Sequence, residues 1–150
     1  MTASIAFPET PERRAEITRQ IQAETGLDEA LLERVVRAFY GTARQDPVIG
    51  HLFDDVQDWE AHIVRITTFW SSVALMSGRY QGNPMAPHLK LPLEPLHFVR
   101  WLALFEQTVR DLCSEAGGDL LLEKARRIAQ SLQFGVEAKR GMLPVRQRTA

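Results

Sequence analysis

One histidine of the chain stands between two prolines, in the segment 85–92 with the sequence MAPHLKLP. Because a proline fixes its own φ angle and lacks a backbone N–H, Pro87 and Pro92 confine His88 to a short helical turn with rigid ends. An imidazole held in this way can serve as an axial ligand to a metal. On these residues alone, a histidine in a surface loop is the commoner outcome of such a segment.

Three further side chains could act as hydrogen-bond donors or ligands inside the fold. Tyr40 offers a phenol, Trp101 offers an indole N–H, and His62 lies on an apolar helical face. Each has an ordinary alternative: aromatic residues at helical spacing usually pack in a core, and an inward histidine is usually satisfied by one hydrogen bond. Their types alone therefore leave function open.

Other site chemistry finds little support in the sequence. Glu94 and His97 have the Glu-x-x-His spacing of carboxylate-bridged iron bundles, but such bundles need two of these motifs and this chain has one. There is no Gly-x-Gly-x-x-Gly, phosphate loop, His-Glu-x-x-His or Gly-x-Ser-x-Gly motif. Cys113 is the one cysteine, so no internal disulfide can form, and no Cys-x-x-Cys-His motif attaches a haem covalently.

Length and composition indicate one globular domain. The chain has 150 residues, 45% of them hydrophobic and 25% charged, with a net charge of -1. This charge argues against nucleic acid as an obligatory partner. No stretch has the length of a signal peptide or of a membrane span, and we expect a cytoplasmic protein.

Residues that cap helices and residues that end them divide the chain into helices, which would position these side chains. We expect one helix from Pro11 to before Gly26, a second that Asp28 caps and Asp46-Pro47 ends, and a third from Asp58 to Gly78. Turns should fill 47–57, and an irregular loop 79–87.

The second half of the chain follows the same pattern. Pro95 should begin a helix that Gly117-Gly118 ends, and Asp119 should cap the last helix. No alternating run of strand length appears, so the sequence predicts an all-α domain of about six helices. Its organisation would be an N-terminal extension with a short helix over 1–27, a main domain over 28–140 and a disordered tail over 141–150.

Several of these segments, in this order, resemble the truncated haemoglobins, and their third group in particular. The matching pieces are Phe39-Tyr40, Gly50-His51-Leu52-Phe53, Trp59-x-x-His62 with Phe69-Trp70, Ala86-Pro87-His88-Leu89-x-Leu91-Pro92 and His97-Phe98-x-x-Trp101-Leu102-x-Leu104-Phe105. The resemblance covers roughly residues 31–133. The Gly-Gly pairs that other truncated groups place between their early helices and before the proximal helix are missing here, which also favours the third group.

The resemblance implies a 2-over-2 helical sandwich around one non-covalently bound haem b. His88 would be the proximal iron ligand, and Tyr40, His62 and Trp101 would lie on the distal side around the bound ligand. Six apolar residues would form the walls of the haem pocket: Phe53, Ile66, Phe69, Trp70, Leu91 and Phe98. Candidates for partners of the haem carboxylates are Arg13, Arg14, Arg79, Lys90 and Arg100.

The function implied is reversible binding of O2, CO, NO and other diatomic ligands. An enzymatic role is left open; if there is one, a haem-dependent NO dioxygenase or a peroxidase-like activity fits, served by an unknown reductase. The alternative is a cofactor-free helical adaptor or regulatory module, in which the aromatic residues are core and the histidines are incidental.

Overall fold

The computed structural model describes residues 10–141, and they form six α-helices and one 3₁₀-helix. The elements are α1 (Pro11–Thr25), α2 (Glu29–Ala43), η1 (Gly50–Phe53), α3 (Trp59–Leu75), α4 (Met85–Leu89), α5 (Pro95–Leu112) and α6 (Glu115–Lys139). No strand occurs in this range, so the predicted all-α class is confirmed. Nearly all of the predicted tail, from residue 142 on, lies outside the described residues. None of the described helices is long and apolar enough to cross a membrane.

Side-chain caps begin most of the long helices. The side chains of Thr10, Asp28 and Asp58 accept hydrogen bonds from the backbone N–H three residues on, as the sequence predicts. Pro95 occupies the first turn of α5, also as predicted.

The predicted start of the last helix is wrong. Ser114, not Asp119, caps α6, and its hydroxyl oxygen accepts from the N–H of Gly117 at 3.0 Å. The glycine pair therefore lies inside the first turns of α6 and does not separate two helices. A Cβ on Gly117 would lie 2.8 Å from the carbonyl oxygen of Thr25, so the glycine lets α6 approach the end of α1 closely.

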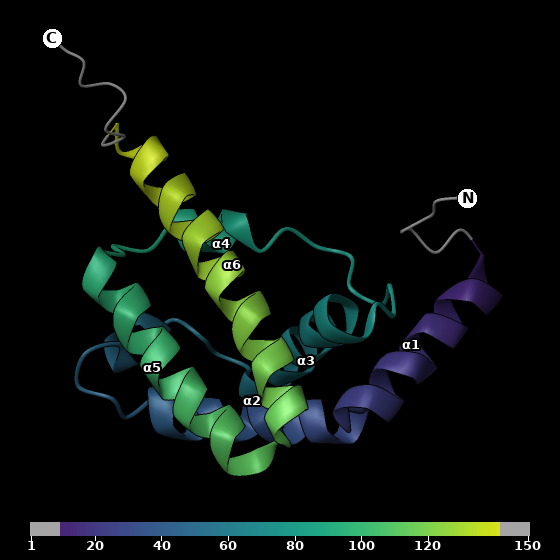
Figure 1. The fold of residues 1–150 in the computed structure, drawn as a ribbon. Coiled ribbons are helices and arrows are strands. Elements are labelled where there is room, and N and C mark those ends of the chain that lie inside the picture. The colour runs from purple at the N-terminus through teal and green to yellow at the C-terminus, as the bar shows by residue number, and fades with distance from the viewer. Residues whose placement is uncertain (1–9, 142–150) are drawn as a thin grey trace, which may run out of the picture.

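The long helices form two packed pairs. Helix α2 packs against α3, and α5 packs against α6, while α2 with α5 and α3 with α6 join the pairs. Figure 1 shows α5 and α6 side by side, with α2 crossing below them and α1 at the edge of the molecule. Short α4 lies against the second half of α6.

The apolar core is divided into two clusters. The larger one joins α2, α3 and the second half of α5 to the first half of α6, and it includes Phe39, Tyr40, Trp70 and Phe105. The smaller one joins α4 and the start of α5 to the second half of α6. Leu52, Trp101, Leu102 and Ile128 pack on both clusters and are only partly buried.

Asp46 fixes the turn that follows α2. Its carboxylate is buried and accepts from the N–H groups of Val48 and Ile49 and from the guanidinium of Arg100, which lies 2.7 Å away on α5. The pKa of Asp46 is lowered, mainly by Arg100 and then by the two backbone donors. Next in the turn, Gly50 lies where a Cβ would be 2.6 Å from the carbonyl oxygen of Arg44. This turn thereby positions η1 against α5.

We expect Asp46→Asn to lower the free energy of unfolding by about 1–3 kcal/mol at pH 7, because it removes a charged hydrogen bond from a buried acceptor. The pKa of Asp46 in the folded state lies below its ordinary value of 3.8. The ionised carboxylate therefore contributes fully to the free energy of unfolding above pH 3.8, and this contribution is lost as the pH falls through the folded-state pKa. Denaturant titrations at several pH values measure the effect.

The matched control for this prediction is Asp54→Asn, which changes an exposed carboxylate a few residues further on. The ion pair would not have the assigned role if the difference in free energy of unfolding between Asp46→Asn and wild type stayed constant from pH 7 down to pH 3.

Candidate functional site

Helix α4 presents His88 with one ring nitrogen already engaged. Nδ1 of His88 lies 2.5 Å from the carbonyl oxygen of Pro84, four residues earlier. A carbonyl oxygen only accepts hydrogen bonds, so Nδ1 carries the proton and Nε2 keeps its lone pair. This is the tautomer and the kind of orienting partner that metal-binding histidines have. The predicted loop ends earlier than expected, because α4 begins at Met85 and contains Pro87 in its first turn.

His62 on α3 offers a second imidazole in an apolar setting. Its Nε2 is buried and has no hydrogen-bond partner among the described residues. The pKa of His62 is lowered, first by burial, then by the charge of Arg65 and by the charge that His88 would carry. His62 is therefore neutral at pH 7.

Tyr40 brings α2 into the same place. Its ring makes edge contacts with His62 and Phe53, at centroid distances of 5.1 and 5.4 Å, and a tilted contact with Trp59 at 5.4 Å. Burial raises the pKa of Tyr40 well above its ordinary value, so its hydroxyl keeps its proton at neutral pH. The structure thus brings together two of the three predicted distal residues.

Trp101 is separated from Tyr40 by one aromatic ring, that of Phe39. Its indole stacks on Phe105 at 5.3 Å, and Phe39 makes edge contacts with both Trp101 and Tyr40. Phe39 therefore connects the predicted donor pair, and no direct ring contact joins Tyr40 and Trp101 within residues 10–141. Trp101 packs on both core clusters and is only partly buried.

The six predicted wall residues divide into two kinds. Trp70 and Phe98 are buried, Trp70 stacked on Phe105 and Phe98 inside the smaller cluster. The other four are large apolar side chains that are only half-buried: Phe53, Ile66, Phe69 and Leu91.

The two core clusters meet at partly buried apolar side chains. Leu52 of η1, Trp101 and Leu102 of α5 and Ile128 of α6 pack on both clusters, while on α3 the buried Nε2 of His62 has no hydrogen-bond partner among the described residues. Buried polar atoms of this kind are normally satisfied, so an unpartnered nitrogen indicates a missing ligand. Two surface hollows lie elsewhere, one beside Gly26 and Ser114 and one beside Thr42 and Thr108.

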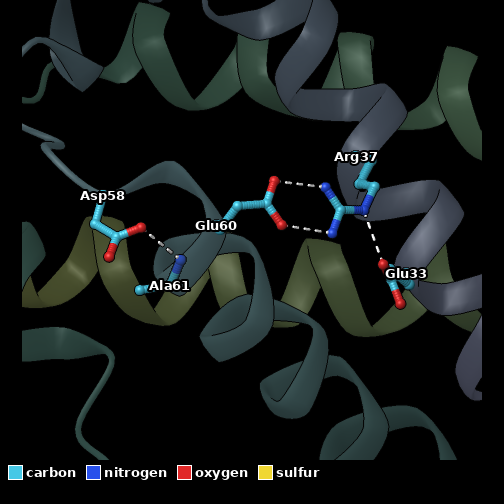
Figure 2. Close-up of polar contacts among 5 residues, drawn as sticks. All are labelled: Glu33, Arg37, Asp58, Glu60 and Ala61. Atoms are coloured by element: carbon cyan, nitrogen blue, oxygen red, sulfur yellow. Dashed lines mark hydrogen bonds and ion pairs between the residues drawn. The ribbon is translucent and has the colours of Figure 1, made fainter.

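Charged contacts hold the first turn of α3, which carries His62, against α2. Figure 2 shows Arg37 of α2 paired with Glu60 and with Glu33. Its two terminal nitrogens each donate to a carboxylate oxygen of Glu60 at 2.9 Å, and its Nε donates to Glu33 at 2.8 Å. Beside it, Asp58 caps α3 through the N–H of Ala61. The guanidinium of Arg44 lies 4.1 Å from the ring centroid of Trp59.

Most of the predicted carboxylate-binding cations have protein partners instead. Arg79 pairs with Glu29, Arg100 with Asp46, and Arg13 with Glu16. The side chain of Arg14 lies against Gly78, and Lys90 is exposed. Arg65, an exposed residue one turn after His62, was not predicted as a site residue. Its charge adds to the lowering of the pKa of His62 and opposes only in part the rise that burial causes in the pKa of Tyr40. The signal available in the sequence was that Arg65 follows His62 by three residues on the same predicted helix, which places the two side chains on one face.

The remaining histidines have a local structural contact. Nδ1 of His97 accepts the N–H of Glu94 at 2.9 Å and so helps to cap α5, while the ring of His51 makes an edge contact with it. This bond is the physical reason for the Glu-x-x-His spacing. No group of three or more metal-ligating side chains occurs in the described part of the chain.

Comparisons with known proteins agree with this architecture. A group 3 truncated haemoglobin of Campylobacter jejuni is 29% identical over 113 residues, which cover 71% of this chain and 89% of that protein. The crystal structure of group III truncated haemoglobin from Campylobacter jejuni superposes with a TM-score of 0.68 and covers 73% of this chain and 91% of that one, at 29% identity. No family model matches the chain. The resemblance predicted from the sequence is confirmed: the chain has the truncated-globin fold and is similar to the group III truncated haemoglobins.

Proposed function

We propose that this protein binds one haem b non-covalently between α3 and α4, with Nε2 of His88 as the proximal ligand. The observation that supports the proposal is the hydrogen bond from His88 Nδ1 to the Pro84 carbonyl, which leaves a lone pair on Nε2 for a metal. The relatives are named haemoglobins, which supports the same cofactor. Haem would supply an iron centre that binds diatomic gases such as O2, CO and NO.

His62, Tyr40 and Trp101 would act on the ligand on the opposite side. The Tyr40 hydroxyl, kept protonated by burial, would donate a hydrogen bond to a ligand oxygen that carries partial negative charge. Trp101 would donate through its indole N–H. Neutral His62 would contact the ligand, control its access, or approach the iron itself when no ligand is present.

The apolar residues would keep water away from the site. Phe53, Ile66 and Phe69 would cover the side of His62, and Leu91 and Phe98 the side of His88, while Trp70 supports Phe105 from behind. Exclusion of water slows oxidation of the cofactor and strengthens each polar contact inside. Arg65, exposed and close to His62, would meet the haem carboxylates at the rim.

The donor pair also favours redox chemistry over simple O2 delivery. Donors that hold a ligand oxygen tightly slow its escape and polarise an O–O bond, which fits detoxification of NO or a peroxidase-like activity. NO detoxification would need a reductase as partner, and a peroxidase-like activity would need an electron-donating substrate; a cytoplasmic location would fit either. A cofactor-free adaptor, the alternative, gives no reason for a buried imidazole nitrogen without a partner.

We expect His88→Gly to bind haemin roughly 100-fold more weakly than wild type, since loss of even an outer partner of a metal ligand costs roughly 10- to 100-fold. Added imidazole should restore the wild-type absorption spectrum, because it can occupy the space left by the side chain. Titration with haemin, followed in the Soret region, measures both effects.

His51→Gly is the control, because His51 is exposed and lies on η1. Unchanged haemin affinity and an unchanged spectrum in His88→Gly would contradict the proximal assignment.

We expect Tyr40→Phe and Trp101→Phe each to speed O2 dissociation roughly 5- to 10-fold, because a hydrogen bond is worth about 1–1.5 kcal/mol. CO dissociation should change less, since bound CO carries less negative charge. Stopped-flow replacement of O2 by CO gives the first rate and replacement of CO by NO the second.

Tyr80→Phe removes the same hydroxyl from a tyrosine whose ring packs on Phe69 and serves as the control. Equal changes in the O2 and CO rates would indicate altered packing and would rule out donation to the ligand.

A further inference from the structure

Five aromatic side chains, beginning with the proposed distal donor Trp101, contact one another in series. The indole of Trp101 stacks on Phe105 with the ring planes 3° apart, and Phe105 stacks on Trp70 with the planes 15° apart. Phe69 then makes edge contacts with Trp70 at 5.7 Å and with Tyr80 at 5.2 Å. We call these five residues the aromatic chain. Tryptophan and tyrosine can give up one electron to a strong oxidant and phenylalanine cannot, so each oxidisable ring is one phenylalanine away from the next.

Tyr80 gives the aromatic chain an oxidisable end at the surface. It lies in the loop between α3 and α4, where its N–H donates to the Ser72 hydroxyl at 2.7 Å. The residue is half-buried, whereas Trp70 is buried. Within residues 10–141 the Tyr80 hydroxyl has no hydrogen-bond partner, yet it is not one of the fully buried polar atoms that lack one. Water therefore contacts this hydroxyl and can take up its proton.

A second aromatic route, through Tyr40 and Trp59, is less suited to carry charge to the surface. The guanidinium of Arg44 lies 4.1 Å from the ring centroid of Trp59, so it opposes the formation of positive charge on this indole. Burial raises the pKa of Tyr40, and loss of its proton is correspondingly costly. No cation lies over the indole of Trp70 or Trp101 in the described part of the chain.

We propose that the aromatic chain conducts electrons from Tyr80 to the haem site, so that Tyr80 is a surface site at which phenol-class donors are oxidised with hydrogen peroxide as the oxidant. This inference rests on the proposed function, since it needs a haem beside Trp101. It goes beyond that function by separating the place where the donor is oxidised from the place where the diatomic ligand binds.

The electrons and protons of the reaction balance. One molecule of hydrogen peroxide takes up two electrons and two protons, its O–O bond breaks, and two molecules of water form. The electrons travel singly: Trp101 is refilled from Trp70, and Trp70 from Tyr80, whose O–H proton passes to water as its electron leaves. Two phenol molecules each return one electron and one proton to Tyr80 and leave as phenoxyl radicals.

The test locates the radical on the protein. Ferric protein loaded with one equivalent of haemin is mixed with hydrogen peroxide and a nitroso spin trap, and peptide mass spectrometry identifies the residue that carries the covalent adduct. Electron paramagnetic resonance after rapid freezing, without the trap, distinguishes a tyrosyl from a tryptophanyl radical. The rate of guaiacol oxidation is measured on the same samples.

We expect the adduct on Tyr80 in wild type and its loss in both Tyr80→Phe and Trp70→Phe, because phenylalanine cannot carry the electron. Both variants should oxidise guaiacol roughly tenfold more slowly or worse, and tenfold is the change that a barrier higher by about 1.4 kcal/mol produces.

Two further variants make the test specific. Tyr80→Trp should keep a radical at position 80 and change its spectrum from tyrosyl to tryptophanyl, which tests the aromatic chain without altering Trp70 in the core. Trp59→Phe is the matched control, because it removes an indole that is not part of the aromatic chain. The adduct on Tyr80 should persist in this control.

An adduct on Tyr40 or Trp59 with Tyr80 unmodified, or an unchanged guaiacol rate in Tyr80→Phe, would overturn the role of the aromatic chain while leaving haem binding intact. The same holds if peroxide produces no protein radical in the haem-loaded protein. Wild-type protein that takes up no haemin would instead overturn the proposed function, and this inference with it.

Discussion

The hydrogen bond from Nδ1 of His88 to the carbonyl of Pro84 is the interaction on which the rest of the site depends. It assigns the proton to Nδ1 and leaves a lone pair on Nε2. A short helix with a proline on each side of the histidine, packed on α6, keeps the bond within four residues of sequence. Without this local bond, the imidazole could rotate and present either nitrogen.

The two core clusters give this histidine its surroundings. One cluster holds α2 and α3 in place through Phe39, Tyr40 and Trp70, and the other holds α4 through α6. The side chains that pack on both clusters are large and only partly buried, and on α3 the Nε2 of His62 is buried with no partner among the described residues. A packed interior does not normally leave these features together. They are the features expected of a protein that completes its core with a flat apolar cofactor.

Much of the architecture follows from local sequence signals. Thr10, Asp28 and Asp58 begin helices because their side chains accept from backbone N–H groups nearby, and Pro95 begins one because it needs no hydrogen bond there. The start of α6 was predicted wrongly because a glycine pair usually marks a break. Here the pair serves a contact with Thr25, some ninety residues away, that no local pattern reveals.

The site was predictable to a similar extent. Helical periodicity placed His62 inward, and the structure brings it to Tyr40. Sequence could not show that Arg100 is engaged by Asp46 or that the charge of Arg65 acts on both Tyr40 and His62. Each of these contacts joins residues from different helices or depends on which face a charge occupies. Such contacts are set by tertiary packing and leave no short-range signature.

The absorption spectrum of the wild-type protein, ferric and then reduced with dithionite, before and after addition of CO, tests the central claim most directly. The account predicts that one equivalent of haemin produces a Soret band and that CO shifts this band sharply in the reduced protein. Sharp, split visible bands before CO is added would assign His62 as an internal ligand. A protein that stayed colourless and took up no haemin would contradict the account and favour a helical adaptor that has kept the fold without the cofactor.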